Sequence, residues 1–327
     1  MKILVTGSAG HLGEAIMRCL RESDHQGVGL DILASPFTDR LGSIVDRGFV
    51  KACMHGIDAV IHTATLHKPH VGTHGAQDFV DTNITGTLNL LEEAYSAGIQ
   101  RFVFTSTTSA FGGALAPAQD RPAAWITEDV HPIPKNIYGV TKVAAEDLCQ
   151  LFHRRHGLSC IVLRTSRFFP EEDDSKEMRE RFADENAKAN EFLFRRVDLE
   201  DAAMAHLRAL ERVPDIGFDR YIISATTPFS TDDLIALRTN APRVVRQRCP
   251  SYEPAYRKRG WHMIKQIDRV YVNEKARTGL GWKPAYDFEH IVKQLGAGTP
   301  IGSALSRTVG IKGYHGTAFD DGPYPVD

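Results

Sequence analysis

A glycine-rich stretch at residues 6–13 constrains the possible folds of this chain more than any other segment. The run before it, residues 2–5, is rich in branched apolar side chains and predicts a strand buried on both faces. After it, apolar residues recur at helical spacing from Leu12 to Leu20. The stretch is therefore a tight turn between a buried strand and a helix.

The turn has the spacing Gly-x-x-Gly-x-x-Gly, formed by Gly7, Gly10 and Gly13. Glycine adopts backbone angles that other residues avoid and lets a ligand approach the main chain. The following helix points unpaired N–H groups and the positive end of its dipole at the turn. These properties predict a pyrophosphate site, although the standard dinucleotide fingerprint is Gly-x-Gly-x-x-Gly. An ordinary tight turn is the alternative that this motif alone leaves open.

Asp31 ends a predicted second strand at residues 27–31 and lies 18 residues beyond Gly13. This is close to the distance at which an acidic residue holds the adenosine ribose of a dinucleotide. A carboxylate accepts hydrogen bonds from the ribose hydroxyls and repels a 2′-phosphate, and no Arg or Lys follows before Arg40. Asp31 therefore favours NAD over NADP, unless it only caps a turn at the strand end.

Strands and helices alternate along the first half of the sequence. A third strand is expected to end at residues 42–46. Three more strands are expected at residues 58–64, 101–105 and 160–164, and long helices at residues 79–94 and 138–152. This alternation predicts an α/β fold of the Rossmann type, a doubly wound parallel sheet with helices on both faces and right-handed crossovers.

The second half of the sequence follows a less regular pattern. Residues 170–190 are crowded with charge and show little apolar periodicity. Strands are expected at residues 192–194 and 221–223, and helices at residues 198–210, 231–237 and, as the last element, 288–295. We expect an NAD-binding Rossmann domain at residues 1–165, rejoined by about 193–215, a small C-terminal α/β substrate lobe at 166–192 and 216–296, and a Gly- and Pro-rich tail at 297–327.

Composition argues against several classes of partner. The formal net charge of −2 gives no reason to expect a nucleic acid or an anionic membrane. No apolar run approaches the ~20 residues that span a membrane, and a strand that starts at Lys2 leaves no room for a signal peptide. The five scattered cysteines indicate reduced thiols, so a cytoplasmic protein is expected.

Tyr138 and Lys142 are spaced i and i+4, which places both on one face of the predicted helix. A free tyrosine has a pKa of ~10, too high for a base at neutral pH. We expect the neighbouring ammonium to lower the pKa of Tyr138 and make it a general acid/base for a substrate hydroxyl. Thr107, just past a strand end, is placed to hold the same oxygen. An incidental pair on a solvated helix is the alternative if the motif is taken alone.

Taken together, these motifs resemble the short-chain dehydrogenase/reductase superfamily, in its extended branch of NAD-dependent sugar epimerases and dehydratases. The resemblance covers about residues 1–295. The matching pieces occur in the order of the family: the glycine turn, Asp31, Asp58, residues 62–64, Asn83, residues 104–112, Tyr138 with Lys142, Leu163 with Arg164, and residues 197–203 and 280–284.

The resemblance implies roles for individual residues. Tyr138 is expected as the acid/base, Lys142 as the group that holds the nicotinamide ribose and tunes Tyr138, and Thr107 as the catalytic hydroxyl. A homodimer through the helices that hold Asn83 and Tyr138 is also implied. The expected substrate-binding set is His67, Lys68, Thr107, Thr108 and Arg167. The expected cofactor-binding set is Gly7, Gly10, His11, Leu12, Gly13, Asp31, Ser43, Ile44, His62, Thr63, Ala64, Asn83, Thr105, Ser106, Tyr138, Lys142 and Arg164.

Departures from the family pattern bear on the reaction. Residues 107–109 read Thr-Thr-Ser where dehydratases carry Thr-Asp-Glu, so dehydration is not expected. Phe111 stands where epimerases carry Tyr, and the Asn that contacts a nucleotide-sugar is replaced near Arg167. Arg167 is suited to bind a carboxylate or phosphate through two parallel bonds, which resembles the task of uronate dehydrogenases. Pairing of Arg167 with a carboxylate at residues 171–174 is the alternative.

Two further clusters, one of histidines and one of basic residues, can be explained without a ligand. His62, His67, His70 and His74 lie close in sequence, but no metal is expected, because Pro69 favours a loop and the family needs no metal. Six basic residues between positions 243 and 259 either grip a diphosphate or form a solvated basic loop.

The sequence therefore predicts an enzyme that uses NAD to oxidise a sugar hydroxyl. Our first hypothesis is a sugar or nucleotide-sugar epimerase, in which the hydride returns to the substrate. The alternative is an NAD-dependent dehydrogenase of a sugar or sugar acid, which releases NADH. A third hypothesis, a non-catalytic NAD-sensing regulator, would need none of Thr107, Tyr138 and Lys142.

Overall fold

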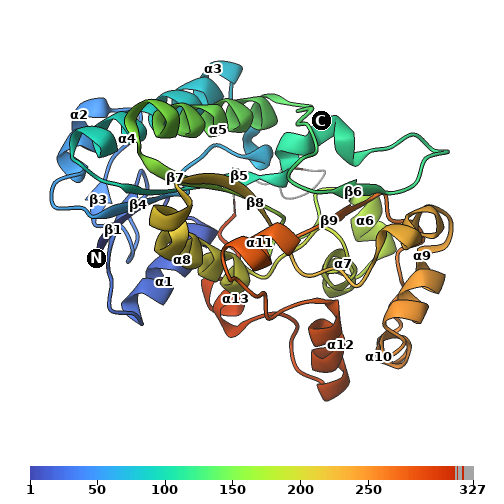
Figure 1. The fold of residues 1–327 in the computed structure, drawn as a ribbon. Helices are drawn as coiled ribbons and strands as arrows, with labels where there is room; N and C mark the ends of the chain where they lie inside the picture. The colour runs from blue at the N-terminus through green and yellow to red at the C-terminus, as the bar shows by residue number, and fades with distance from the viewer. Residues whose placement is uncertain (314, 316–318, 320–327) are drawn as a thin grey trace.

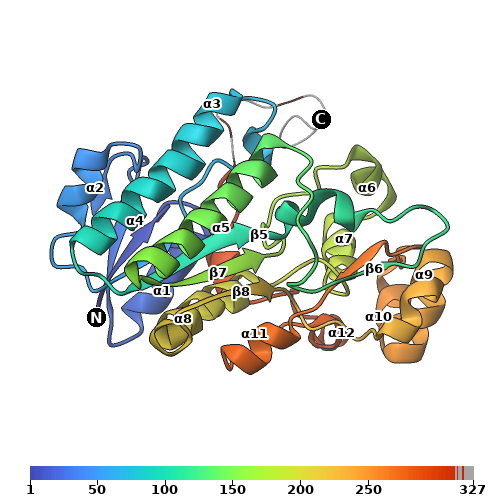
Figure 2. The same ribbon diagram turned by 45° about the horizontal axis from the view of Figure 1, so that its top comes forward.

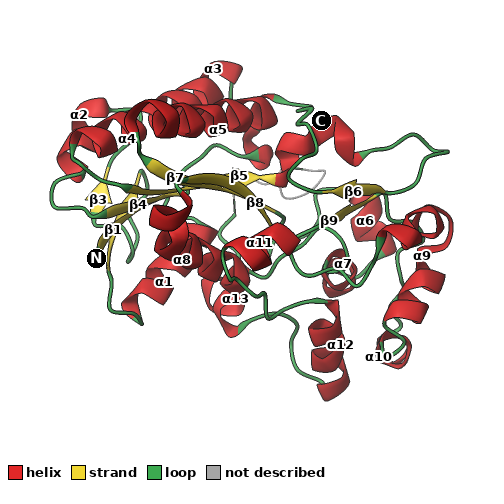
Figure 3. Cartoon of the chain, viewed as in Figure 1, coloured by secondary structure: helices red, strands yellow, loops and turns green. Residues whose placement is uncertain are grey.

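Seven parallel strands form the central sheet of the computed structural model, which describes residues 1–313, 315 and 319 (Figure 1). Their order is β3-β2-β1-β4-β5-β7-β8, so the winding reverses beside β1. Figure 3 shows the strands in yellow with red helices on both sides. The predicted Rossmann-type sheet is confirmed. The strands are β1 (Lys2–Thr6), β2 (Gln26–Asp31), β3 (Arg40–Leu41), β4 (Ala59–His62), β5 (Arg101–Thr107), β7 (Ser159–Thr165) and β8 (Phe218–Ile223).

Helices cover both faces of the sheet. One layer consists of α2 (Arg47–Cys53), α3 (Ala76–Phe79), α4 (Gly86–Ser96) and α5 (Ile137–His156), with α4 and α5 side by side in Figure 2. The other consists of α1 (His11–Arg21), α8 (Leu199–Ile216), α11 (Glu274–Gly279) and α13 (Ala304–Val309). Because side chains alternate along a strand, Ile3 and Val5 belong to the core under α1 and α8, and Leu4 to the core under α2 and α4.

A smaller lobe lies beyond the carboxyl ends of the strands (Figure 1). It contains a two-stranded parallel sheet of β6 (Ala124–Ile126) and β9 (Arg269–Tyr271), which the sequence pattern did not predict. Its helices are α6 (Lys176–Arg181), α7 (Asp184–Glu191), α9 (Leu234–Arg248), α10 (Tyr252–Arg259) and α12 (Phe288–Ala297). Aromatic side chains such as Tyr256 and Phe288 fill a separate core there.

Two strand predictions differ from the structure. The third strand, expected to end at residues 42–46, is β3 and already ends at Leu41, and Asp46 instead caps α2 by accepting a hydrogen bond from the Phe49 N–H at 3.0 Å. The apolar run 192–194 forms a turn after α7, in which the Phe194 N–H donates to the Glu191 carbonyl at 3.0 Å. That run is apolar because its side chains are buried in the lobe core, so an apolar run alone did not distinguish a strand from a turn.

Four features of the second half also differ from the prediction. The charged segment 170–190 contains α6 and α7, and the helix expected at 231–237 is α9, which runs to Arg248. β8, predicted as part of the lobe, is the edge strand of the central sheet. The helix at 288–295 is not the last, because α13 follows it and packs on the α1 layer, where the Ser303 N–H donates to Asp198 at 2.9 Å. Most of the predicted tail after residue 313 lies outside the described residues.

None of the helices within the described part of the chain has the length and apolar character needed to cross a bilayer.

Candidate active site

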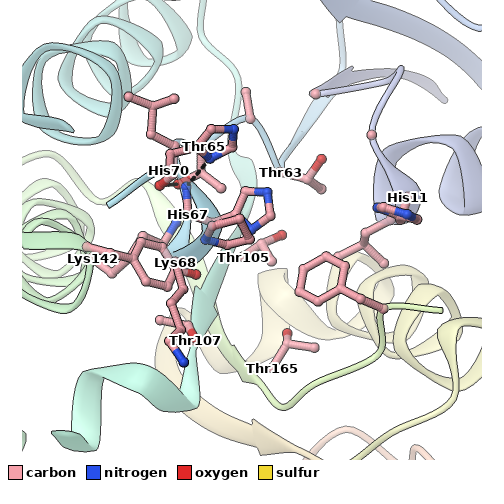
Figure 4. A pocket seen from close by; sticks show the side chains of 18 of the residues that line it. His11, Thr63, Thr65, His67, Lys68, His70, Thr105, Thr107, Lys142 and Thr165 are labelled. Carbon is pink, nitrogen blue, oxygen red and sulfur yellow. Dashed lines mark hydrogen bonds between the residues drawn. The ribbon is translucent and has the colours of Figure 1, made fainter. Parts of the chain in front are cut away.

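A cavity of about 940 Å³ opens at the carboxyl ends of the strands, where the winding reverses between β1 and β4. Open α/β sheets bind ligands at this place, and the volume is at the upper end of the ~300–1,000 Å³ typical of ligand sites. Its walls come from the glycine turn, the ends of β4, β5 and β7, the start of α5 and the lobe. In Figure 4, His11 and Lys142 lie on opposite sides of the cavity, with His67 between them.

The glycine turn leaves no room for side chains. Gly7 has a φ of +73°, and a Cβ on it would lie 2.7 Å from the backbone nitrogen of Ala64. A Cβ on Gly13 would lie 2.0 Å from the carbonyl oxygen of Gly7, so α1 can pack on the turn only through glycine. Gly10, Gly13 and the residues between them line the cavity, which exposes the amino terminus of α1 to a ligand.

Asp31 forms the neighbouring part of the wall. Its carboxylate accepts hydrogen bonds from the N–H groups of Ala9 at 2.8 Å and Leu33 at 2.9 Å. These bonds fix the carboxylate beside the glycine turn. Next to it, the apolar side chains of Ile32 and Leu33 line the cavity while remaining 68% and 63% exposed. Sequence reasoning missed this apolar surface, which two exposed aliphatic residues after a strand-end Asp could have indicated.

These features fit a dinucleotide. The bare backbone and the start of α1 suit a pyrophosphate, the Asp31 carboxylate suits ribose hydroxyls, and the apolar surface suits a flat base. Most of the predicted cofactor set lines this cavity: Gly7, Gly10, His11, Leu12, Gly13, Asp31, Ser43, Ile44, Thr63, Ala64, Thr105, Ser106, Tyr138 and Lys142.

Thr107 and Tyr138 meet where β5 ends and α5 begins. The Thr107 hydroxyl accepts a hydrogen bond from the Ser109 N–H at 3.0 Å. Tyr138 lies in the first turn of α5, which Asn136 caps by accepting from the Gly139 N–H at 3.0 Å. Burial raises the pKa of Tyr138 to about 12, and a hydrogen bond with Thr107 opposes this rise. The structure therefore brings together the two hydroxyls that the sequence paired.

Lys142 lies one helical turn after Tyr138 and is 3% exposed. Its ammonium lies 4.1 Å from the centre of the Phe104 ring. Burial lowers the pKa of Lys142 to about 7. For the chain by itself, the prediction that Lys142 lowers the pKa of Tyr138 is wrong, because burial dominates and the group that opposes it is Thr107.

Asn83 is buried behind the cavity wall and does not line it. Its side-chain oxygen accepts hydrogen bonds from the Thr65 hydroxyl at 2.8 Å and the Leu66 N–H at 2.9 Å. Its side-chain nitrogen donates to the Thr141 hydroxyl at 3.0 Å. This placement contradicts a direct cofactor contact. Through Thr141, Asn83 instead helps to order the helix turn that carries Lys142.

His62 and Arg164, both predicted to bind the cofactor, do not line the cavity. His62 is 1% exposed, and its ring nitrogens hydrogen-bond to the hydroxyls of Thr6 at 2.8 Å and Thr87 at 3.0 Å. Arg164 forms a buried ion pair with Glu146 at 2.7 Å. Both predictions are wrong, since the His62 ring is hydrogen-bonded inside the core and Arg164 is held there by Glu146, although Nη1 of Arg164 has no partner among the described residues.

The predicted substrate residues lie at the lobe end of the cavity, with Thr107 and Thr108 at its edge. The ring of His67 stacks on Phe169 with centroids 5.3 Å apart. Lys68 pairs with Asp174, and Arg167 pairs with the same carboxylate at 3.1 Å. The alternative for Arg167, pairing with a nearby carboxylate, is therefore the arrangement observed.

The tail closes one side of the cavity, which the sequence did not indicate. The N–H groups of Lys312 and Gly313 donate to the Glu171 carboxylate at 3.2 and 3.3 Å, and both residues line the cavity. Glu171 also pairs with His11 at 2.8 Å, and the Lys312 ammonium pairs with Glu14 at 2.6 Å. The tail segment has no apolar periodicity, so no sequence pattern could have revealed these contacts.

The neighbouring histidines touch ring to ring. His70 lies against His67 and His74, with centroids 4.7 and 5.1 Å apart. Across residues 1–313, 315 and 319, no three His, Cys, Asp or Glu side chains form a group that could hold a metal ion.

A sequence model described as the NAD dependent epimerase/dehydratase family matches residues 3–221. The chain is similar to the L-arabinose 1-dehydrogenase (NAD(P)(+)) of Haloferax volcanii, with 31% identity over 242 residues that cover 68% of this chain and 88% of that protein. It is also similar to the low-salt glycan biosynthesis protein Agl12 of the same organism, with 32% identity over 184 residues that cover 52% of this chain and 57% of that protein.

Among solved structures, the chain resembles a short-chain dehydrogenase/reductase superfamily protein from Agrobacterium tumefaciens with bound NAD. The TM-score is 0.65 at 20% identity, and the match covers 91% of this chain and 96% of that chain. At this identity the likeness shows the fold alone. The chain spans about half the length of several curated relatives that it matches, Agl12 among them.

Proposed function

Because the chain belongs to the NAD dependent epimerase/dehydratase family, we propose that it transfers a hydride between a sugar hydroxyl carbon and NAD, with Tyr138 as the acid/base. One observation carries the proposal. Thr107, Tyr138 and Lys142 line the same cavity that contains the glycine turn. A proton-transfer group and a dinucleotide site in one cavity are what such a reaction requires.

The glycine-turn end of the cavity is the part that would hold NAD. The N–H groups at the start of α1 suit the pyrophosphate, Asp31 suits the ribose hydroxyls, and Ile32 with Leu33 suits the adenine ring. When bound, NAD supplies the nicotinamide carbon that accepts the hydride. NAD is preferred over NADP because the Asp31 carboxylate would repel a 2′-phosphate.

Tyr138 moves the proton in this proposal, and Thr107 orients the substrate oxygen. With a pKa of about 12, the phenol keeps its proton at neutral pH and suits the step that protonates a carbonyl oxygen. In the reverse direction Tyr138 accepts the proton of the substrate hydroxyl, which a nearby positive charge favours. In the chain by itself Lys142 does not lower the pKa of Tyr138, so we propose that Lys142 supplies this charge once NAD and the substrate are bound. Its pKa of about 7 makes the protonated form available near neutral pH.

An epimerase-like enzyme remains our first choice of reaction, on the family description. A specific likeness favours the dehydrogenase of a sugar or sugar acid as the second candidate, since the L-arabinose 1-dehydrogenase is matched over 88% of its length. Both reactions begin with the same oxidation at Tyr138. They differ in whether the hydride returns to the substrate or NADH leaves.

A turnover assay separates these candidates. The protein is incubated with NAD and a panel of free sugars, sugar acids and UDP-sugars, while NADH absorbance and isomer formation are followed. Growth of NADH absorbance with one substrate supports the dehydrogenase. Isomer formation from a sugar or nucleotide-sugar without net NADH supports the epimerase. Absence of both for every substrate class contradicts the proposed function.

The proposal includes a homodimer formed through α4 and α5. Tyr95 on α4 and Val140 and Leu151 on α5 are exposed apolar side chains, at 45%, 50% and 37%. A paired surface would remove this apolar area from water. Sedimentation at about twice the chain mass of 36.3 kDa supports the dimer, and sedimentation at the monomer mass contradicts it.

A further inference from the structure

β9 directs alternate side chains toward the cavity and toward the lobe core. Arg269 and Tyr271 line the cavity, whereas Val270 between them is fully buried in the lobe core. The backbone of Arg269 is fixed by pairing with Ala124 of β6. Arg269 therefore presents its side chain to the cavity from a rigid element at the lobe end.

The guanidinium of Arg269 has no ion pair with any described residue, and its Nε is buried without a hydrogen-bond partner. Neighbouring cations at this end of the cavity are paired: Lys68 and Arg167 contact Asp174, and Arg195 contacts Asp173. A buried donor without a partner costs free energy. A group from outside the chain would relieve that cost.

Lys135 is a second cation of the cavity wall without an ion pair among residues 1–313, 315 and 319. It is exposed, whereas Arg269 is half-buried. Because water screens an exposed charge, Lys135 discriminates weakly between charged and neutral ligands. Lys142, the other cation of the wall without an ion pair among the described residues, lies one helical turn from Tyr138. Arg269 is therefore the cation of the lobe end able to select an anionic ligand.

A second cavity of about 390 Å³ adjoins the first at Arg269. The two share the charged residues Lys68, Asp174, Arg195 and Arg269. Arg269 thus stands at their junction, with space on both sides for the rest of a ligand whose anionic group it holds.

We propose that Arg269 binds an anionic group of the substrate, a carboxylate or a phosphate, while the reacting hydroxyl lies at Tyr138. This inference rests on the proposed function for the identity of the ligand as a sugar. Both anions offer two oxygens to the planar guanidinium, which matches them with parallel hydrogen bonds. The role predicted for Arg167 thereby passes to Arg269, because Asp174 occupies Arg167.

Calorimetric titration of the NADH-bound protein tests this inference without turnover. The probes are glucose as the neutral sugar, glucuronate for a carboxylate, glucose 1-phosphate for a phosphate and UDP-glucose for a diphosphate. We expect at least one anionic probe to bind about 10- to 100-fold more tightly than glucose, the range of a charge-assisted hydrogen bond. The probe that shows this preference identifies the source of the anion.

Arg269→Gln is expected to reduce the affinity for that probe to within about 3-fold of glucose and to leave glucose binding unchanged. Arg269→Lys keeps the charge without the planar fork, so it is expected to retain part of the preference. Arg246→Gln is the matched control, because Arg246 is 57% exposed and pairs with Glu253 on the surface of the lobe. It should keep the full preference.

Circular dichroism shows whether each variant folds. If Arg269→Gln does not fold, the preference of Arg269→Lys for the anionic probe over glucose is the test of the inference. An unchanged preference in Arg269→Lys would then overturn the inference. So would the absence of any preference for an anion in the wild type, or a preference that persists in Arg269→Gln. Failure of the proposed function is distinguishable, since it removes turnover in the assay above and leaves these affinities measurable.

Discussion

The two ends of the cavity are built in different ways. At the glycine-turn end, the walls are the backbone of short segments that follow neighbouring strands β1, β2 and β4. At the lobe end, the walls are charged side chains from positions between 68 and 269, joined by ion pairs such as Arg195 with Glu191 at 2.6 Å. At the glycine-turn end, the shape of the exposed protein backbone selects the ligand. At the lobe end, the charges of the side chains select it.

This difference predicts opposite sensitivities. An end built from backbone tolerates loss of side-chain charge but no added atoms, because close-packed main chain has nowhere to move. An end built from paired charges tolerates modest changes of shape, but loss of one charge leaves its partners buried and unpaired.

The largest effect is expected for one methyl group added at the glycine-turn end. In Gly13→Ala the new Cβ would lie 2.0 Å from the Gly7 oxygen, so α1 must move off the turn. We expect a loss of about 5 kcal/mol in the free energy of unfolding and no measurable NAD binding. Urea denaturation and NAD titration measure the two effects. Gly296→Ala, where a Cβ meets nothing within 4 Å, is the matched control. It should leave NAD binding unchanged and should not lower stability, since alanine favours the helix α12 more than glycine does.

The second largest effect on stability is expected when one charge is removed at the lobe end. Glu191 is 2% exposed and contacts Arg195 at 2.6 Å and Arg196 at 3.5 Å. Glu191→Gln leaves Arg195 with Asp173 as its remaining carboxylate and Arg196 without an ion pair among the described residues. We expect it to cost about 3 kcal/mol of unfolding free energy. NAD affinity should stay unchanged, which would separate the two ends. Glu185→Gln, on the exposed side of the same helix, should have no effect on stability.

The stability difference between the wild type and Glu191→Gln is expected to depend on pH. Burial alone would raise the pKa of Glu191, but the charges of Arg195, Arg167 and Arg196 outweigh it and lower the pKa to about 2. Since the unfolded pKa is ~4.3, the stabilisation is complete above that value and is lost as pH falls toward the folded pKa. The stability gap between wild type and Glu191→Gln should therefore shrink between about pH 5 and pH 2. A gap that stays constant over this range would contradict the ion-pair account.

The smallest effect is expected for a charge removed at the glycine-turn end. Asp31→Asn keeps the acceptor oxygen for one N–H and removes the charge that meets the ribose. We expect NAD to bind about 10-fold more weakly, as for loss of one hydrogen bond to a charged group, and NADP to bind more tightly than to the wild type. Fluorescence titration with both cofactors measures the ratio, and an unchanged preference would show that Asp31 serves only the turn.

The contrast between the two ends also explains what the sequence could predict. A site built from backbone can be recognised as a local sequence motif. Steric contacts require glycine at positions 7 and 13, and Asp31 follows at a fixed distance. The sheet was predictable for the same reason, since each strand and helix carries its own periodicity. His62 and Arg164 were misassigned because a position near the carboxyl end of a strand does not reveal whether the side chain points to the cavity or to a partner such as Glu146.

The lobe end depends on contacts between distant residues, which local patterns do not report. Arg167 and Asp174 were both visible in the sequence, but only the folded chain shows that they pair and that Arg269 does not. The strand predicted at residues 192–194 is wrong for a related reason. A turn that is buried in the lobe core has apolar side chains just as a buried strand has.

The most direct test of the central claim is the rate of hydride transfer in Tyr138→Phe, measured in a single turnover with saturating NAD and the sugar identified by the turnover assay. Phenylalanine keeps the ring in its buried place and removes the hydroxyl that shares a hydrogen bond with Thr107. The account predicts a rate lower by about 10²- to 10⁴-fold, the contribution of a general acid/base, with NAD affinity unchanged. A variant that transfers hydride at the wild-type rate would contradict it.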